Sequence, residues 1–301
     1  MLGSKRIKIL LLSLLVMAGF GTVLSGCSSH ASKQSSSKIN VVASTDFYGE
    51  VARAVVGNKG TVHAVINKAS VDPHDYEPTP NVAKTVHHAD IVIANGIGYD
   101  SWMDRLATGK KTTLIRVGNE LLHKQNGDNP HLWYRPQTMP TLARALAKKF
   151  GQEQPQNKAY FEHNATRYIK SLAPINTEMT QIKRLSIKQG QKRVYVSEPV
   201  FDYALQALGF KVANRDFEEA IENESDPSPK AIRQMQNGLE KHQVAFFVFN
   251  QQVDSKTVNN LVAIARKNHV PVLKVTETLP DGLTYKQWML SQYQQLAHIL
   301  K

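Results

Sequence analysis

The sequence predicts an α/β protein of two lobes, each a mainly parallel sheet flanked by helices, joined by one long rigid helix. First, short apolar runs alternate with segments of helical periodicity from residue 39 onward, which is typical of parallel sheets covered by helices. Second, the apolar runs form two groups, four before residue 118 and three after residue 192. Third, the polar stretch 156–188 between them has no glycine and one proline, Pro174, and so predicts the linking helix.

The individual elements follow from these periodicities. The expected strands are the apolar runs 39–43, 61–66, 91–94, 113–117, 193–196, 244–249 and 272–275. The expected helices include 49–56, 82–88, 138–150, 200–208 and 258–268. We therefore expect an N-terminal lobe over 39–152, a linking helix over 153–189 and a C-terminal lobe over 190–301.

The N-terminal segment has the pattern of a secretory signal. Three basic residues among the first eight precede an almost continuous apolar stretch, 9–24. This stretch is shorter than the ~20 residues of a comfortable membrane span and fits the apolar region of a signal peptide better.

The residues that follow resemble a bacterial lipobox. Leu24-Ser25-Gly26 places small residues directly before Cys27, and a serine-rich stretch comes next. We expect 1–26 to be a lipoprotein signal peptide, Cys27 to carry the lipid, and 27–38 to form a flexible tether that is too polar to fold. The folded part is then held at the extracytoplasmic face of the cell membrane by the lipid on Cys27.

Composition restricts the chemistry. Cys27 is the only cysteine, so the chain can form no intramolecular disulfide and has no second thiolate for a metal site. The formal net charge is +12, of which three basic residues lie in 1–26. The remaining Lys and Arg are spread along the chain without a dense cluster among aromatic residues, so we expect no nucleic-acid partner.

Two loops present a histidine beside a proline. His74 lies in the segment 72–80 (DPHDYEPTP), where Thr79 and Pro80 have the pattern of a helix N-cap and first turn. His131 lies in 129–136 (NPHLWYRP) and also follows a proline. A stiff loop holds an imidazole at a fixed angle, which suits a metal ligand, although either histidine alone is equally compatible with hydrogen bonding within its loop.

Two carboxylates stand where buried strands are expected to end. Glu198 follows the strand 193–196, and Glu277 follows 272–275. Ligands of open α/β sheets bind beyond the carboxyl ends of the strands, so a cleft between the lobes would gather both carboxylates with His74 and His131. Two neutral imidazoles and two carboxylates suit, and neutralise, one divalent ion such as zinc or manganese.

Other polar residues have weaker signals. Asp46 and Asn250 are expected near the cleft because each follows a predicted strand, and Asp281 is expected in a turn with Gly282. The remaining histidines are interpreted as surface, tether or packing residues: His30, His63, His87, His88, His123, His163, His242, His269 and His298.

With these residues in view, the chain resembles the metal-binding solute receptors of ABC importers, the cluster A-I zinc/manganese family, also described as the bacterial solute-binding protein 9 family. The resemblance extends from residue 39 to the C-terminus. It rests on the order and spacing of 42–48 (VASTDFY), 72–80, 89–96 (ADIVIANG), 129–133 (NPHLW) and 276–280 (TETLP).

The resemblance implies two α/β lobes linked by a rigid helix, with the metal in the cleft between them. It places His74, His131, Glu198 and Glu277 at the family's four ligand positions. Zinc members often have His where this chain has Glu198, the family commonly has Asp where this chain has Glu277, and the His-rich acidic loop of many zinc members is missing. These features lean to manganese and leave zinc open.

The implied function is a monomeric, lipid-anchored receptor without catalytic activity, which captures Mn²⁺ or Zn²⁺ and delivers it to an ABC permease in the cytoplasmic membrane. A metal-dependent surface hydrolase is one alternative, but catalytic zinc usually has three protein ligands and an open position for water. A surface adhesin is another alternative, and no motif in the sequence favours it.

Overall fold

Two four-stranded sheets, each entirely parallel, organise the part of the chain that the computed structural model describes, residues 38–71, 73 and 76–301. The first has the order β2-β1-β3-β4, from β1 (Ile39–Thr45), β2 (Gly60–Ile66), β3 (Ile91–Ala94) and β4 (Thr113–Arg116). The second has the order β6-β5-β7-β8, from β5 (Arg193–Val196), β6 (Lys211–Val212), β7 (Phe247–Asn250) and β8 (Val272–Val275). The predicted fold class is confirmed.

The strand order creates a crevice in each lobe. β1 pairs with β2 on one side and β3 on the other, and β5 pairs with β6 and β7 in the same way. The central strands of the sheets are β1 and β3 in the first and β5 and β7 in the second. The connections that follow the two central strands of a sheet run in opposite directions. Open α/β sheets bind ligands at the point between such strands.

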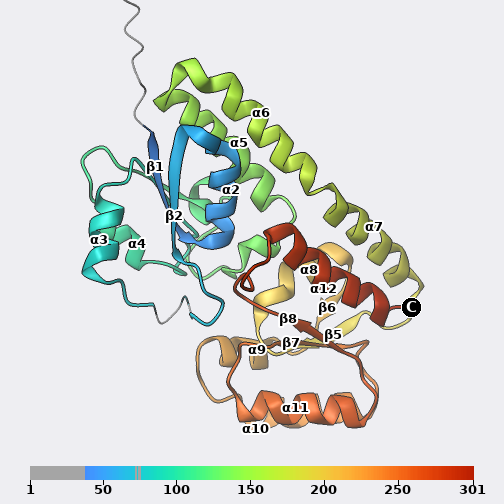
Figure 1. The fold of residues 1–301 in the computed structure, drawn as a ribbon. Coiled ribbons are helices and arrows are strands. Elements are labelled where there is room, and N and C mark those ends of the chain that lie inside the picture. The colour runs from blue at the N-terminus through green and yellow to red at the C-terminus, as the bar shows by residue number, and fades with distance from the viewer. Residues whose placement is uncertain (1–37, 72, 74–75) are drawn as a thin grey trace, which may run out of the picture. The chain divides into compact units, whose positions relative to one another are not determined.

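Helices cover both sheets (Figure 1). The first lobe has α2 (Asp46–Val56), α3 (Pro80–His87), α4 (Trp102–Leu106) and α5 (Thr138–Glu153), followed by α6 (Lys158–Ser171) and α7 (Ala173–Lys188). The second has α8 (Asp202–Leu208), α9 (Arg215–Glu222), α10 (Pro229–Glu240), α11 (Lys256–Lys267) and α12 (Tyr285–Ile299). Short helical turns lie at η1 (Gly57–Lys59), η2 (Val117–Leu121), η3 (Leu132–Tyr134), η4 (Pro155–Asn157) and η5 (Pro199–Phe201). Among the described residues, no helix combines the length and the apolar character needed to cross a membrane.

The linking segment differs from the single helix that the sequence predicts. It consists of two helices, α6 and α7, which meet at Leu172. Pro174 lies in the first turn of α7, where it has no N–H to donate and its ring would clash with the carbonyl of Lys170 in a continuous helix. One proline therefore divides the linker.

One strand prediction needs correction, and one strand was not predicted. The run 244–249 forms a strand only over Phe247–Asn250, because the neighbouring β8 begins at Val272, which pairs with Phe247. The second sheet also gains the edge strand β6, which at two residues is too short to show a periodicity.

One apolar core runs through both lobes. Trp133, completely buried, packs on Phe47 of α2 with ring centroids 4.7 Å apart. The adjacent Tyr134 contacts Phe201 of η5 at 5.0 Å and Trp288 of α12 at 5.6 Å. Since a packed interior resists shear, this shared core favours small movements of one lobe against the other.

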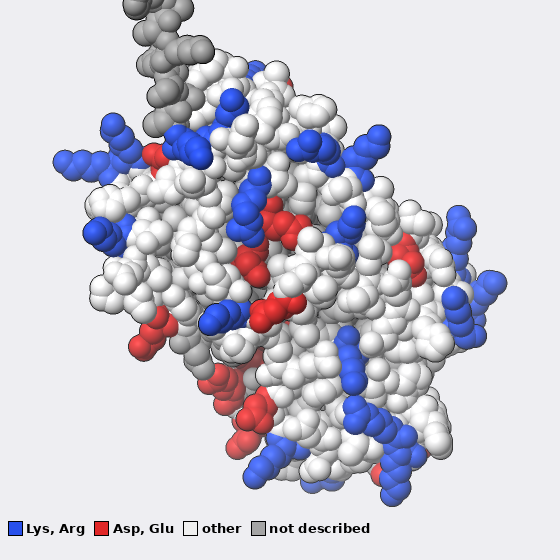
Figure 2. Space-filling view, in the orientation of Figure 1, with Lys and Arg blue, Asp and Glu red and all other residues white. Residues whose placement is uncertain are grey.

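Charged side chains are distributed rather than gathered. Figure 2 shows Lys and Arg scattered over the visible face with Asp and Glu between them. The Arg116 guanidinium, for example, forms ion pairs with Asp104 at 2.7 Å and with Glu120 at 3.3 Å. This face has the mixed charge of an ordinary solvated surface.

Candidate metal centre

His131 is held in a defined orientation and protonation pattern. Its side chain is fully buried, and its Nδ1 lies 2.9 Å from Oδ1 of Asn129. The Asn129 amide nitrogen donates to the Pro199 carbonyl at 2.7 Å, which identifies the other amide atom as the oxygen. Nδ1 of His131 must then carry a proton, which makes Nε2 the ring atom through which His131 would bind a metal.

Two carboxylates approach this nitrogen. The Oε1 atom of Glu277 lies 3.8 Å from Nε2 of His131, and Oε1 of Glu222 lies 3.9 Å from it. Two ligand atoms that share an ion at ~2.1 Å are at most about 4.2 Å apart, so both distances allow an ion between the groups. A cation between these groups would be attracted to both carboxylates.

Glu277 is positioned by both its backbone and its side chain. Its N–H donates to Oε1 of Gln252 at 2.6 Å, and its Oε1 accepts from the Tyr99 hydroxyl at 2.9 Å. Burial raises the pKa of Tyr99 well above its ordinary value, and the Glu277 carboxylate raises it further. Tyr99 therefore remains a hydrogen-bond donor to Glu277 at all physiological pH values.

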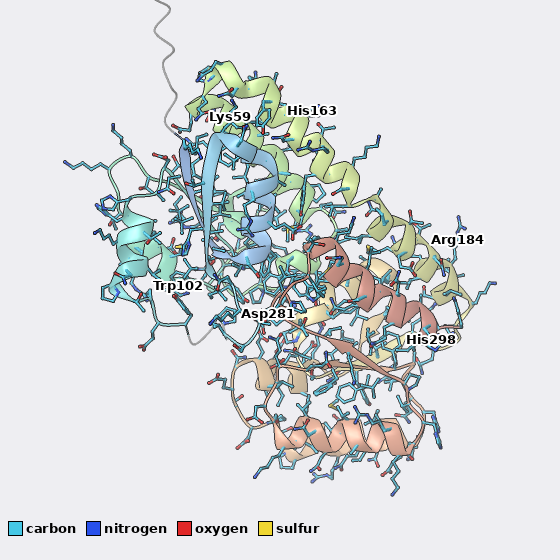
Figure 3. The ribbon with its side chains drawn as sticks, in the orientation of Figure 1. Lys59, Trp102, His163, Arg184, Asp281 and His298 are labelled. Carbon is cyan, nitrogen blue, oxygen red and sulfur yellow. The ribbon has the colours of Figure 1, made fainter. Side chains whose placement is uncertain are left out.

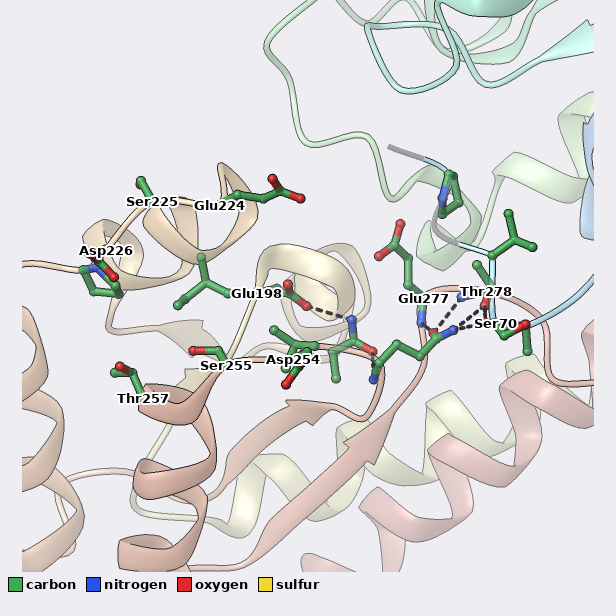
Figure 4. Close-up of a pocket in the computed structure, with 18 residues that line it drawn as sticks. Ser70, Glu198, Glu224, Ser225, Asp226, Asp254, Ser255, Thr257, Glu277 and Thr278 are labelled. Carbon is green, nitrogen blue, oxygen red and sulfur yellow. Dashed lines mark hydrogen bonds between the residues drawn. The ribbon is translucent and has the colours of Figure 1, made fainter. Parts of the chain in front are cut away.

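Glu198 stands at the crevice of the second sheet, just after β5. Its Oε2 accepts from the Asn250 amide at 2.7 Å, and Oδ1 of Asn250 accepts from the Gln252 N–H at 3.2 Å. Glu198, Asn250 and Glu277 line one pocket, so the expectation that Asn250 faces the cleft is confirmed. Figure 4 shows Glu198 and Glu277 in this pocket, each reaching it from the end of a different strand.

The loop that contains His74 is anchored on both sides. Before it, the Ala69 N–H donates to Asp281 at 3.2 Å, and the Ala69 carbonyl accepts from the Thr278 hydroxyl at 2.9 Å. After it, the Tyr76 ring packs on Trp102 with centroids 4.9 Å apart, and Thr79 caps α3 as predicted. His74 itself, like Cys27, lies outside the described residues.

The structure thus brings together part of the predicted ligand set. His131 faces Glu277 directly, while Glu198 shares a pocket with Glu277. Within 38–71, 73 and 76–301, no three His, Cys, Asp or Glu side chains already stand close enough to enclose an ion. The predicted set includes His74 in addition, and its four-ligand arrangement stays a prediction.

The remaining candidates lie in ordinary structural settings. Figure 3 shows His163 on α6 and His298 on α12, and neither residue lines the pocket that contains Glu198 and Glu277. Asp281 is in a loop with Gly282, whose φ of +77° favours glycine, as the sequence predicts. Asp46 begins α2, and burial raises its pKa to about 6, while its expected place beside the metal stays a prediction.

Sequence reasoning missed four residues of this centre. Glu222 is the last residue of α9 and carries no local signal. Tyr99 and Gln252 contact Glu277 only through long-range folding. Asn129 had a usable signal, because an amide two residues before a ligand-type histidine can orient its ring.

Comparison with known proteins places this arrangement in a family. A family model described as the periplasmic zinc-uptake complex component A matches residues 41–299. The manganese ABC transporter substrate-binding lipoprotein ScaA of Streptococcus gordonii is 26% identical over 308 residues, which cover 95% of this chain and 96% of that protein. The corresponding manganese lipoprotein PsaA of Streptococcus pneumoniae is 26% identical over 277 residues, or 87% of this chain and 86% of that protein.

Solved structures share the fold. A manganese-bound periplasmic metal-binding protein from Candidatus Liberibacter asiaticus has a TM-score of 0.72 and 18% identity, covering 88% of this chain and all of that one. Zinc-bound AdcA from Streptococcus pneumoniae has a TM-score of 0.66 and 20% identity over 87% of this chain and 57% of that one. Because the family model spans both lobes and the linker, the chain belongs to the family of periplasmic zinc-uptake component A proteins.

Proposed function

We propose that this chain is the substrate-binding lipoprotein of an ABC importer and captures Mn²⁺ or Zn²⁺ for delivery to a permease in the cytoplasmic membrane. The observation that carries this proposal is the position of the buried Nε2 of His131, which lies 3.8 Å from a carboxylate oxygen of Glu277 and 3.9 Å from one of Glu222. The names of the relatives, manganese ABC transporter substrate-binding lipoproteins, support the same role.

The proposed ligands of the transported ion are His74, His131, Glu198 and Glu277. His131 donates to Asn129, whereas Glu198 accepts from Asn250. Glu277 accepts from Tyr99. Each of these hydrogen bonds orients a proposed ligand. Two carboxylates also balance the two charges of the ion. The carboxylate oxygens of this set favour manganese, because manganese is the harder of the two ions and prefers oxygen ligands.

The membrane anchor is the lipid on Cys27, released from the signal peptide 1–26, with 27–38 as the tether. The two lobes, 39–152 and 190–301, then clamp the ion with the linker 153–189 between them. Because the lobes share one core, closure is a small rearrangement at the cleft. The receptor acts as a monomer and performs no catalysis.

Native mass spectrometry of the mature chain with equimolar Mn²⁺ and Zn²⁺ tests this function. We expect one tightly bound ion per chain, and its loss in His131→Ala. His163→Ala, which removes an exposed histidine from α6, is the matched control and should retain the ion. A wild-type chain that takes up neither ion, or turnover of peptides or esters that depends on His131, would contradict the proposal.

A further inference from the structure

Glu222 lies closer to the metal centre than its place in the sequence indicates. Its Oε1 is 3.9 Å from Nε2 of His131, nearly the same separation as that of Glu277, and its side chain is only 16% exposed. Glu222 ends α9, a two-turn helix of the second lobe, whereas His131 belongs to the first lobe. The pair therefore joins the two lobes across the cleft.

The position of α9 is set by the core and not by this pair. Asn214, directly before the helix, receives the Val196 N–H at 3.1 Å and donates to the Val196 carbonyl at 2.7 Å. Phe217, in the middle of the helix, is buried against the second sheet. Since Val196 is two residues before Glu198, the same strand end positions both carboxylates.

The electrostatics of Glu222 favour a cation beside it. The C-terminal end of a helix carries partial negative charge, so a cation is favoured beside a carboxylate at that end. Its Oε1 also lies 3.9 Å from Nε2 of His131, the same nitrogen that Oε1 of Glu277 approaches to 3.8 Å. A divalent ion at this point is attracted to all of these groups at once.

We propose that Glu222 supplies an additional carboxylate oxygen to the ion in the cleft and thereby favours manganese over zinc. This assignment rests on the proposed metal-receptor function and adds a residue to its ligand set. Zinc is satisfied by four ligands in a closed site, while manganese accepts a larger number of oxygen ligands. A further oxygen from α9 therefore stabilises bound Mn²⁺ more than bound Zn²⁺.

The test compares Mn²⁺ and Zn²⁺ affinities by competition titration of the mature chain and of Glu222→Gln. We expect Mn²⁺ affinity to fall about tenfold, which is typical for mutation of a residue that supports a metal site. Zn²⁺ affinity should change much less. X-ray absorption of the Mn²⁺-loaded proteins should show one oxygen fewer around the ion in the variant. Glu219→Gln removes the same charge from an exposed position of α9 and should leave the Mn²⁺ to Zn²⁺ ratio unchanged.

Glu222→Asp keeps the charge on a shorter arm and should restore part of the preference, a result that a purely structural role would not produce. Thermal unfolding by circular dichroism establishes that each variant is folded. Wild-type binding with an unaltered ion ratio and coordination number in folded Glu222→Gln would overturn the assignment of Glu222 alone. Failure of the wild-type chain to bind either ion would overturn the receptor function and this inference with it.

Discussion

The side-chain amide of Asn129 donates a hydrogen bond to the carbonyl of Pro199 at 2.7 Å. Its side-chain oxygen accepts a hydrogen bond from Nδ1 of His131 at 2.9 Å. One amide therefore orients the imidazole of the first lobe and attaches it to the residue beside Glu198 in the second. The two functions of this side chain can be separated by mutation.

Asn129→Ala removes both contacts, and we expect metal affinity to fall between about tenfold and a hundredfold, because the His131 ring loses its orienting acceptor. Asn129→Asp keeps an acceptor for Nδ1 and loses the donor to Pro199. We expect it to retain most of the affinity and to lose about 1 kcal/mol of unfolding free energy. Isothermal titration with Mn²⁺ and urea unfolding measure the two effects. Equal affinities for wild type and Asn129→Ala would show that Asn129 does not orient the ring.

Gln252 connects the second lobe to the loop before His74. Its side-chain oxygen accepts from the Glu277 N–H at 2.6 Å, and its amide nitrogen donates to the Ala69 carbonyl. We expect Gln252→Ala to lower the free energy of unfolding by about 1 kcal/mol and to weaken metal binding, because both anchored loops gain freedom. Gln251→Ala, a substitution of the exposed neighbour, is the control for urea unfolding and titration. Indistinguishable results for the two variants would argue against a connecting role.

Tyr285 makes two hydrogen bonds to residues that are distant in the sequence. Its hydroxyl donates to the Trp133 carbonyl at 2.7 Å, and its own N–H donates to Glu50 at 2.7 Å. Tyr285→Phe leaves the buried carbonyl without this donor, so we expect a loss of about 1 to 3 kcal/mol in thermal or urea unfolding. Tyr195→Phe, whose hydroxyl makes a longer 3.4 Å bond, should lose less. A larger loss in Tyr195→Phe would contradict this ranking.

The raised pKa of the buried Glu218 carboxyl should make the stability of the protein depend on pH. Burial, and then the Asp202 carboxylate, raise the pKa of Glu218 above that of an ordinary glutamate, while Arg215 acts in the opposite direction and Glu219 and Glu222 add to the rise. The native state therefore binds more protons than the unfolded chain between the ordinary and the raised pKa. The stabilisation is complete at acid pH, below the unfolded pKa, and is lost as the pH rises through the raised value.

Glu218→Gln cannot ionise and should make this dependence flatter. At pH 5 the metal-free variant should unfold at nearly the urea concentration of the wild type, and at pH 9 we expect it to be more stable by about 1 to 3 kcal/mol. Asp216→Asn, at an exposed position of the same helix, should keep the wild-type slope. A steeper slope in Glu218→Gln would mean that the carboxylate is stabilised in its ionised form.

The sequence by itself determined the fold class and predicted three residues that line one pocket of the structure. Apolar runs at β1, β3, β5 and β8 are long enough to show buried strands, and parallel strands place the residues after them on one edge. This reasoning located Glu198, Glu277 and Asn250. The histidine motifs, in turn, are local patterns in which proline stiffens a loop.

Tertiary structure alone decided which side chains meet. Glu222 reaches His131 because Asn214 and Phe217 fix α9 against the second sheet, and the bonds from Tyr99 and Gln252 to Glu277 join residues of different elements. Periodicity reports which face of an element is buried, not where that element stands relative to another. The charge and the number of oxygen atoms at the candidate site depend on those relative positions, so they follow only from the packed structure.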